Sequence, residues 1–185
     1  MAGPLVRGTA IACGIAAVAG LGIGIAVGKP AQPDDLQSAR LLPEDLCARL
    51  GDISTLLPKA TTARLIQTGS TELTCAVPEP TAASLTIRIT PYSGRQAGPG
   101  RSPFVPAEVA RQSFDRKPWP MVKDRPYPTK LDKRAGTNGR DSHVAVLVYR
   151  GDLTVQVDYA AYPIDLVAAQ RAVQVLADRA LWESK

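Results

Sequence analysis

The residue types that carry out enzymatic chemistry are sparse and poorly spaced in this chain of 185 residues. The single histidine, His143, follows Asp141 and Ser142, so the three residue types of a serine-hydrolase triad stand side by side. Consecutive residues of a strand point to opposite faces, and these neighbours therefore cannot assemble a triad among themselves. The sequence contains no CxxC or HExxH spacing, no P-loop and no dinucleotide-binding fingerprint. We expect no catalytic site, no metal and no cofactor, and an enzyme is the least favoured class of function.

Two cysteines, Cys47 and Cys75, lie outside the apolar N-terminal run. An even pair in an exported domain predicts a disulfide, which here would join an early helix to an early strand. Two buried free thiols are the alternative. A structural pair would leave neither cysteine for catalysis.

The strongest functional signal is a basic segment, residues 95–140, which holds eleven Lys and Arg side chains against four acidic ones. Residues 30–94 and 141–185 are each net negative, so the positive charge is concentrated in this segment. Aromatic side chains, including Trp119 between two prolines, are interleaved with the cations. Outside a membrane, such a segment would bind lipid head groups, a phosphate-bearing wall polymer or an acidic protein, and we expect no nucleic acid partner. The residues predicted to contact the anionic partner are Arg111, Arg116, Lys117, Trp119, Lys123, Arg125, Lys130, Lys133 and Arg134. A solvated loop whose aromatic side chains fill the core is the alternative.

An uncharged run, residues 9–28, lies between two single basic residues near the N-terminus. As a helix, this run would span about 30 Å, the thickness of a hydrocarbon core. We therefore predict a membrane anchor in residues 1–30, with the rest of the chain exported. A cleaved signal peptide remains open, because Ala26 and Gly28 are small residues of the kind that a signal peptidase reads. Cleavage would make the protein secreted.

Gly20, Gly24 and Gly28 belong to a stripe of small residues at every fourth position of the apolar run. Such a stripe lets a second helix approach closely, so these glycines are candidates for pairing with another membrane protein or a second copy of the chain. Residues 31–40 are polar without apolar periodicity and predict a linker. Residues 41–185 would then form one extracytoplasmic domain.

The pattern of residues 41–185 predicts an α+β fold, with an antiparallel sheet of about five strands flanked by helices. The expected order is helix, three strands, helix, loop, two strands and helix. The corresponding residues are 43–51, then 63–68, 73–77 and 84–90, then 106–117, then 143–149 and 153–159, and finally 164–182. Arg150-Gly151-Asp152 matches an adhesion tripeptide, but Gly-Asp between two alternating strands is better explained as a hairpin turn.

The Pro-Glu-Asp-Leu-Cys context of Cys47, the later Cys75 and a closing amphipathic helix after a hairpin resemble small actinobacterial cell-envelope proteins. Many of these are lipoproteins of unknown function, and some related envelope domains have a Mog1/PsbP-like fold. The resemblance implies a fold and a location more than an activity. This chain departs from the lipoprotein pattern, because residues 9–12 are too few for an apolar region before a lipidated Cys13.

These features predict a non-enzymatic, membrane-anchored extracytoplasmic domain of the bacterial cell envelope that binds an anionic partner through residues 95–140. The alternative is an extracytoplasmic sensor or accessory subunit that pairs with another membrane protein through its N-terminal helix.

Overall fold

The computed structural model describes residues 39–53, 55–56, 66–68, 72–76, 83–134, 143–161 and 165–184. The predicted anchor, the glycine stripe at Gly20, Gly24 and Gly28, and Asp141 and Ser142 lie outside these residues. Among the described helices, none combines the length and the hydropathy needed to cross a bilayer.

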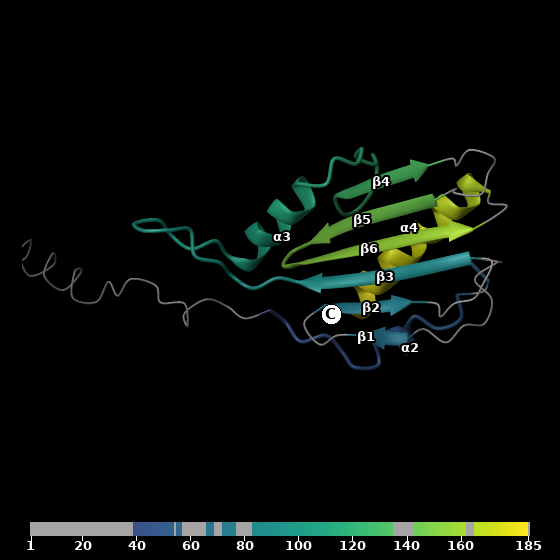
Figure 1. The fold of residues 1–185 in the computed structure, drawn as a ribbon, viewed down its shortest axis with the longest axis horizontal. Helices are drawn as coiled ribbons and strands as arrows, with labels where there is room; N and C mark the ends of the chain where they lie inside the picture. The colour runs from purple at the N-terminus through teal and green to yellow at the C-terminus, as the bar shows by residue number, and fades with distance from the viewer. Residues whose placement is uncertain are drawn as a thin grey trace, which may run out of the picture. The chain divides into compact units, whose positions relative to one another are not determined.

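An antiparallel sheet of six strands, in the order β1-β2-β3-β6-β5-β4, forms the centre of the described domain (Figure 1). The α+β class and the antiparallel sheet are therefore confirmed. The elements are α2 (Leu46–Arg49), β1 (Ile66–Thr68), β2 (Leu73–Ala76), β3 (Ala83–Pro91), α3 (Pro106–Asp115), β4 (Thr129–Arg134), β5 (His143–Arg150), β6 (Leu153–Ala161) and α4 (Leu166–Glu183).

Strand β4 was not expected, because the sequence of residues 129–134 has one strongly apolar residue, Leu131, among charged neighbours. It is the last strand of the sheet, paired with β5 along one side and, along the other, only bridged by residues 120–122. Charged residues, lysines above all, are typical of edge strands, where they discourage pairing with another chain. The prediction of a loop here was wrong for that reason.

The β5–β6 hairpin confirms the turn predicted at Arg150-Gly151-Asp152. Arg150 pairs with Leu153, so Gly151 and Asp152 form a two-residue turn. Gly151 has φ of 57°, a backbone conformation that glycine adopts without steric penalty.

One face of the sheet, here called the α4 face, carries the hydrophobic core. Ile87, Val157 and Val146 lie side by side across three strands and are fully buried. Helix α4 covers them with a stripe of small and aliphatic side chains, as its amphipathic sequence predicts (Figure 1). The helix begins two residues later than expected, because the Asp165 carboxylate caps it by accepting the amides of Val167 and Ala168 at 2.9 and 3.1 Å.

The predicted disulfide between Cys47 and Cys75 is present and joins α2 to β2, with 5.6 Å between the two Cα atoms. Both cysteines are buried in the core of the α4 face. Helix α2 is shorter than the expected 43–51, and Gly51, with φ of 66°, lies just beyond its end.

The opposite face, here called the α3 face, is covered by α3 at one end. Phe114 of α3 packs on Tyr149 of β5 with ring centroids 5.8 Å apart, and the Tyr149 hydroxyl donates to the Ala107 carbonyl. Farther along β3 and β6 this face is polar, with Arg88 exposed and Gln156 and Asp158 half-buried. The C-terminal end of α3, where the basic segment continues, contacts β4 at the edge of the sheet through Lys130.

Candidate functional site

The nine residues predicted to contact an anionic partner do not form one surface. The structure divides them among the interior, the α4 face, the far end of β4 and the loop that follows α3. Only the last of these places retains several exposed cations close together in the chain.

Lys130 is buried, which corrects its assignment to a binding surface. Its side chain is 7 % exposed, and its ammonium donates to the carbonyls of Phe114, Asp115 and Lys117 at 2.9, 3.1 and 2.6 Å. These carbonyls lie at the C-terminal end of α3, where helix carbonyls lack intrahelical partners and the dipole favours a cation. The ammonium also lies 4.8 Å from the centre of the Phe114 ring. Lys130 therefore anchors α3 to β4 and is not free to meet a ligand.

Three other predicted residues are engaged within the domain. Arg125 donates to the Asp178 carboxylate of α4 at 2.6 Å, and its side chain is 17 % exposed. Lys133 donates to Gln170, also of α4, at 2.8 Å. Arg134, at the end of β4, donates to the neighbouring Asp132 at 2.9 Å.

Arg111 remains on the outer side of α3, within 3.6 Å of the Asp115 carboxylate one turn later. Both side chains are well exposed, so this pair contributes little to stability and leaves Arg111 accessible. Its charge is, however, partly offset by this neighbour.

The remaining predicted residues form what we call the basic surface: Arg116, Lys117, Trp119 and Lys123, together with Met121. Arg116, Lys117 and Lys123 are exposed, Trp119 is half-buried, and Met121 is 56 % exposed. Among the described residues, Arg116 and Lys123 have no acidic partner. Lys117 lies over the Trp119 ring, with its ammonium 5.2 Å from the ring centre.

The path of this loop explains why Met121 and Lys123 face the same side. The amide of Val122 donates to the Thr129 carbonyl at 2.8 Å, and the amide of Leu131 donates to the Pro120 carbonyl at 3.0 Å. Residues 120–122 thus run extended along β4, with Met121 opposite Lys130. Alternation along an extended chain directs Val122 inward, where it packs against the core, and leaves Met121 and Lys123 on the other side.

Acidic residues border the basic surface without cancelling its charge. Between Arg111 and Arg125 there are five basic side chains and two acidic ones, Asp115 and Asp124, for a net charge of +3. Asp124 has φ of 57°, so the chain turns sharply there and ends the surface. The result is a cationic surface that also carries the half-buried Trp119 ring and the exposed Met121 thioether.

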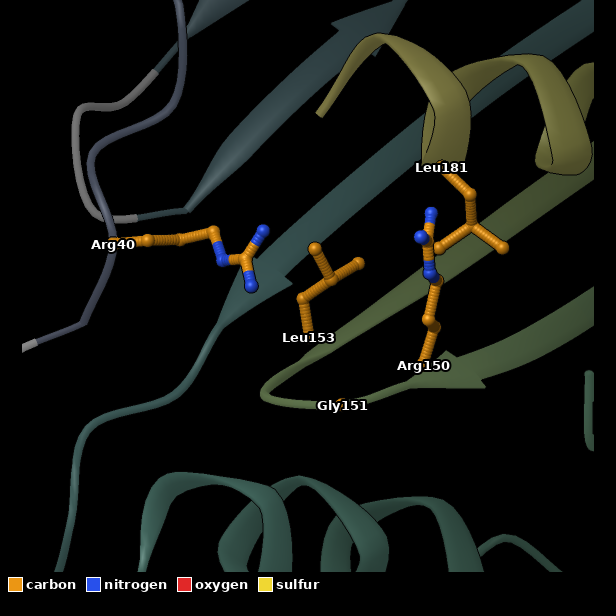
Figure 2. Close-up of a pocket in the computed structure, with 5 residues that line it drawn as sticks. All are labelled: Arg40, Arg150, Gly151, Leu153 and Leu181. Carbon is orange, nitrogen blue, oxygen red and sulfur yellow. The ribbon is translucent and has the colours of Figure 1, made fainter. Parts of the chain in front are cut away.

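The sequence interpretation also missed two arginines that line a pocket of about 340 Å³ with Gly151, Leu153 and Leu181 (Figure 2). Arg40 was assigned to the linker, yet its guanidinium donates to the Asp152 carboxylate at 2.9 Å and to the Ser184 carbonyl at 3.2 Å. Arg150 was interpreted as part of a turn. The charge of each residue was visible in the sequence, but nothing local indicated that they come together.

Among the described residues, the single histidine, His143, meets one carboxylate. Its Nε2 atom lies 3.5 Å from the Asp158 carboxylate across the β5–β6 pair. Within the described ranges, no group of three or more His, Cys, Asp or Glu side chains is arranged to hold a metal ion.

Comparison with known proteins adds no identity. No protein-family model matches the chain, and no curated protein matches it. A crystal structure of a protein from Bacteroides thetaiotaomicron VPI-5482, determined at 1.50 Å resolution, is similar over 58 % of this chain and 39 % of its own, with 11 % identity and a TM-score of 0.32. This chain thus spans well under half of that protein.

Proposed function

We propose that this chain is a non-enzymatic binding or accessory domain of a bacterial cell envelope, held outside the membrane by residues 9–28. In this proposal, the domain binds an anionic partner through the basic surface formed by Arg116, Lys117, Trp119, Met121 and Lys123. The partner is a lipid head group, a phosphate-bearing polymer or an acidic protein.

The observation that carries the proposal is the combination of three exposed cations with exposed apolar area in one short loop. Met121 is one of six exposed large hydrophobic side chains among the described residues, and it lies between Lys117 and Lys123, two residues from the Trp119 ring. Aromatic residues, methionine and arginine are enriched at interfaces, where they supply contact area while the cations supply attraction. The anchoring of α3 by the buried Lys130 favours a preformed surface, which lowers the entropic cost of binding.

The expected electrostatic contribution is modest and depends on salt. Each Lys or Arg near an anionic surface contributes about 1 kcal/mol. Three such residues contribute about 3 kcal/mol, which corresponds to roughly a hundredfold in affinity at low ionic strength. The attraction should weaken as the Debye length falls from about 10 Å at 0.1 M to about 3 Å at 1 M salt.

The location rests on two independent features. The run at residues 9–28 is uncharged and long enough for a bilayer. The Cys47–Cys75 disulfide is typical of a protein that folds in an oxidising compartment. The resemblance to small actinobacterial envelope proteins, some of whose related domains have a Mog1/PsbP-like fold, supports this location.

The test compares two triple variants of the full chain in zwitterionic nanodiscs. The site variant replaces Arg116, Lys117 and Lys123 by Gln. The control variant removes the same charge from three exposed cations outside the basic surface and is R101Q/R134Q/R171Q. Binding is measured to phosphatidylglycerol vesicles, to polyphosphate and to polyglutamate, which represent the three classes of partner.

We expect salt-dependent binding to at least one probe, weakened by tenfold or more in the site variant and by less than threefold in the control. The probe that binds identifies the class of partner. Equal losses in the two variants would mean that net charge alone attracts the probe, and binding unaffected by salt would exclude the electrostatic surface.

A further inference from the structure

The pocket between Arg40 and Arg150 lies at the β5–β6 turn, where the start of the described domain meets the end of α4. It has a volume of about 340 Å³ and is lined by Arg40, Arg150, Gly151, Leu153 and Leu181. Figure 2 shows the Arg40 side chain extended towards Leu153 and the Arg150 side chain extended towards Leu181. The volume is at the lower end of the range for small-molecule sites, about 300–1,000 Å³.

The cationic charge in this pocket is not balanced. Asp152 is the carboxylate that meets Arg40, and it accepts from both Nε and Nη2 of the guanidinium. Arg150, by contrast, is half-buried and has no carboxylate partner among the described residues. Its guanidinium carbon lies 5.1 Å from the centre of the Tyr127 ring, a contact that orients the group without neutralising it.

Both guanidinium groups retain donors for a ligand. A guanidinium has five N–H donors, and the contacts of Arg40 to Asp152 and to the Ser184 carbonyl use three of them. These contacts fix Arg40 in place, so its orientation does not have to be acquired on binding. Arg150 makes no side-chain hydrogen bond within the described part of the chain, so its guanidinium N–H donors remain available to a ligand.

The floor of the pocket is apolar. Leu153 and Leu181 are 2 % and 1 % exposed, and they are part of the hydrophobic core. A simple inorganic anion would contact the arginines alone, whereas a short apolar group attached to an anion would also fill the space beside these leucines. The planar forks of two arginines suit a carboxylate or a phosphate, which accept bidentate hydrogen bonds.

We propose that this pocket binds a small amphiphilic anion, with its carboxylate or phosphate on Arg150 and Arg40 and its short apolar chain on Leu153 and Leu181. The site is separate from the basic surface and shares no residue with it. It would take an alkyl carboxylate or an alkyl phosphate, the chemistry found in free acids and in lipid fragments.

The test uses the full chain in zwitterionic nanodiscs with methyl-labelled leucine and methionine. The probes are hexanoate, hexyl phosphate and, as a neutral control, hexanol, and NMR titration follows the methyl groups. We expect saturable shifts at Leu153 and Leu181 and none at Met121, which reports on the basic surface. The result is thus independent of whether the basic surface binds anything.

Charge dependence is tested with R150Q, R150K and a control variant, R171Q, on the exposed face of α4. We expect R150Q to weaken anion binding at least tenfold, R150K to weaken it less, and R171Q to change it less than twofold. Should R150Q fail to fold, the comparison of the two anions with hexanol in the unmodified protein still shows whether the pocket selects anions.

Binding of hexanoate alone would identify a carboxylate ligand, and binding of hexyl phosphate alone would identify a phosphate; either supports the proposal. Equal binding of hexanol would show an apolar cavity that does not select anions and would overturn it. Absence of saturable shifts at Leu153 and Leu181 with every probe would overturn it as well.

Discussion

Replacing Lys130 by Met tests the structural role that the fold assigns to a lysine of the basic segment. The methionine side chain keeps most of the apolar stem, so packing is preserved while the ammonium is removed. The change abolishes three hydrogen bonds, from the ammonium to the carbonyls of Phe114, Asp115 and Lys117. The Phe114 carbonyl is in a buried contact and would keep only the long hydrogen bond from the Lys117 amide, at 3.3 Å.

The magnitude follows from two opposing contributions. A hydrogen bond to a charged group contributes about 1.5–3 kcal/mol, so three of them give roughly 5–9 kcal/mol. Burying an ammonium costs several kcal/mol, and that penalty is recovered when the charge is removed. The difference, together with a helix-dipole contribution of about 0.3–1 kcal/mol, predicts a loss of about 2–4 kcal/mol in the free energy of unfolding.

Urea unfolding, followed by far-UV circular dichroism, measures this loss. Lys133→Met is the matched control, because Lys133 lies on the same strand but is exposed and donates to Gln170 at the surface. We expect the control to change the free energy of unfolding by less than about 0.5 kcal/mol. If Lys130→Met were no more destabilising than the control, the anchoring of α3 by Lys130 would be refuted.

Three further predictions concern the domain as a whole. Replacing Cys47 and Cys75 by Ala should lower the free energy of unfolding by about 3–4 kcal/mol in urea titrations, and reductant should then have no further effect. Burial raises the pKa of Tyr159, so wild-type stability should fall above pH of about 10, where the unfolded state ionises first, and Tyr159→Phe should reduce that fall. Asp165→Ala, which removes the cap of α4, should cost about 1 kcal/mol in thermal unfolding, and an unchanged melting temperature would exclude the cap as a stabilising feature.

The parts of the fold that were predictable are those specified by nearby residues. Gly151 and Asp152 fix the hairpin because only two residues separate two alternating strands, and the positive φ of Gly151 is a local requirement. The apolar face of α4 repeats with the helical period over eighteen residues, so its register against the sheet follows from its own sequence. The disulfide was predictable because the choice of partner was limited to one pair.

The parts that were not predictable depend on contacts between distant segments. Lys130 is buried because α3, more than a dozen residues earlier, ends above it, and a charged residue gives no local sign of such a partner. Arg40 joins the domain through Asp152, 112 residues later, so a polar sequence that resembled a linker contributes to a pocket. Four of the predicted binding residues stay close together because one loop of eight residues carries them: Arg116, Lys117, Trp119 and Lys123.

Photo-crosslinking in intact envelopes shows directly whether the basic surface meets an anionic partner. A photoreactive phenylalanine analogue is placed at position 121, in the basic surface, and in a matched protein at position 175, an exposed valine of α4. We predict crosslinks from position 121 to an anionic lipid, an anionic polymer or an acidic protein. These crosslinks should be lost when Arg116, Lys117 and Lys123 are replaced by Gln. Mass spectrometry of the same sample also identifies the mature N-terminus and so reports whether residues 9–28 are retained. Equal crosslinking from both positions, or crosslinking from position 121 that survives removal of the three cations, would contradict the account.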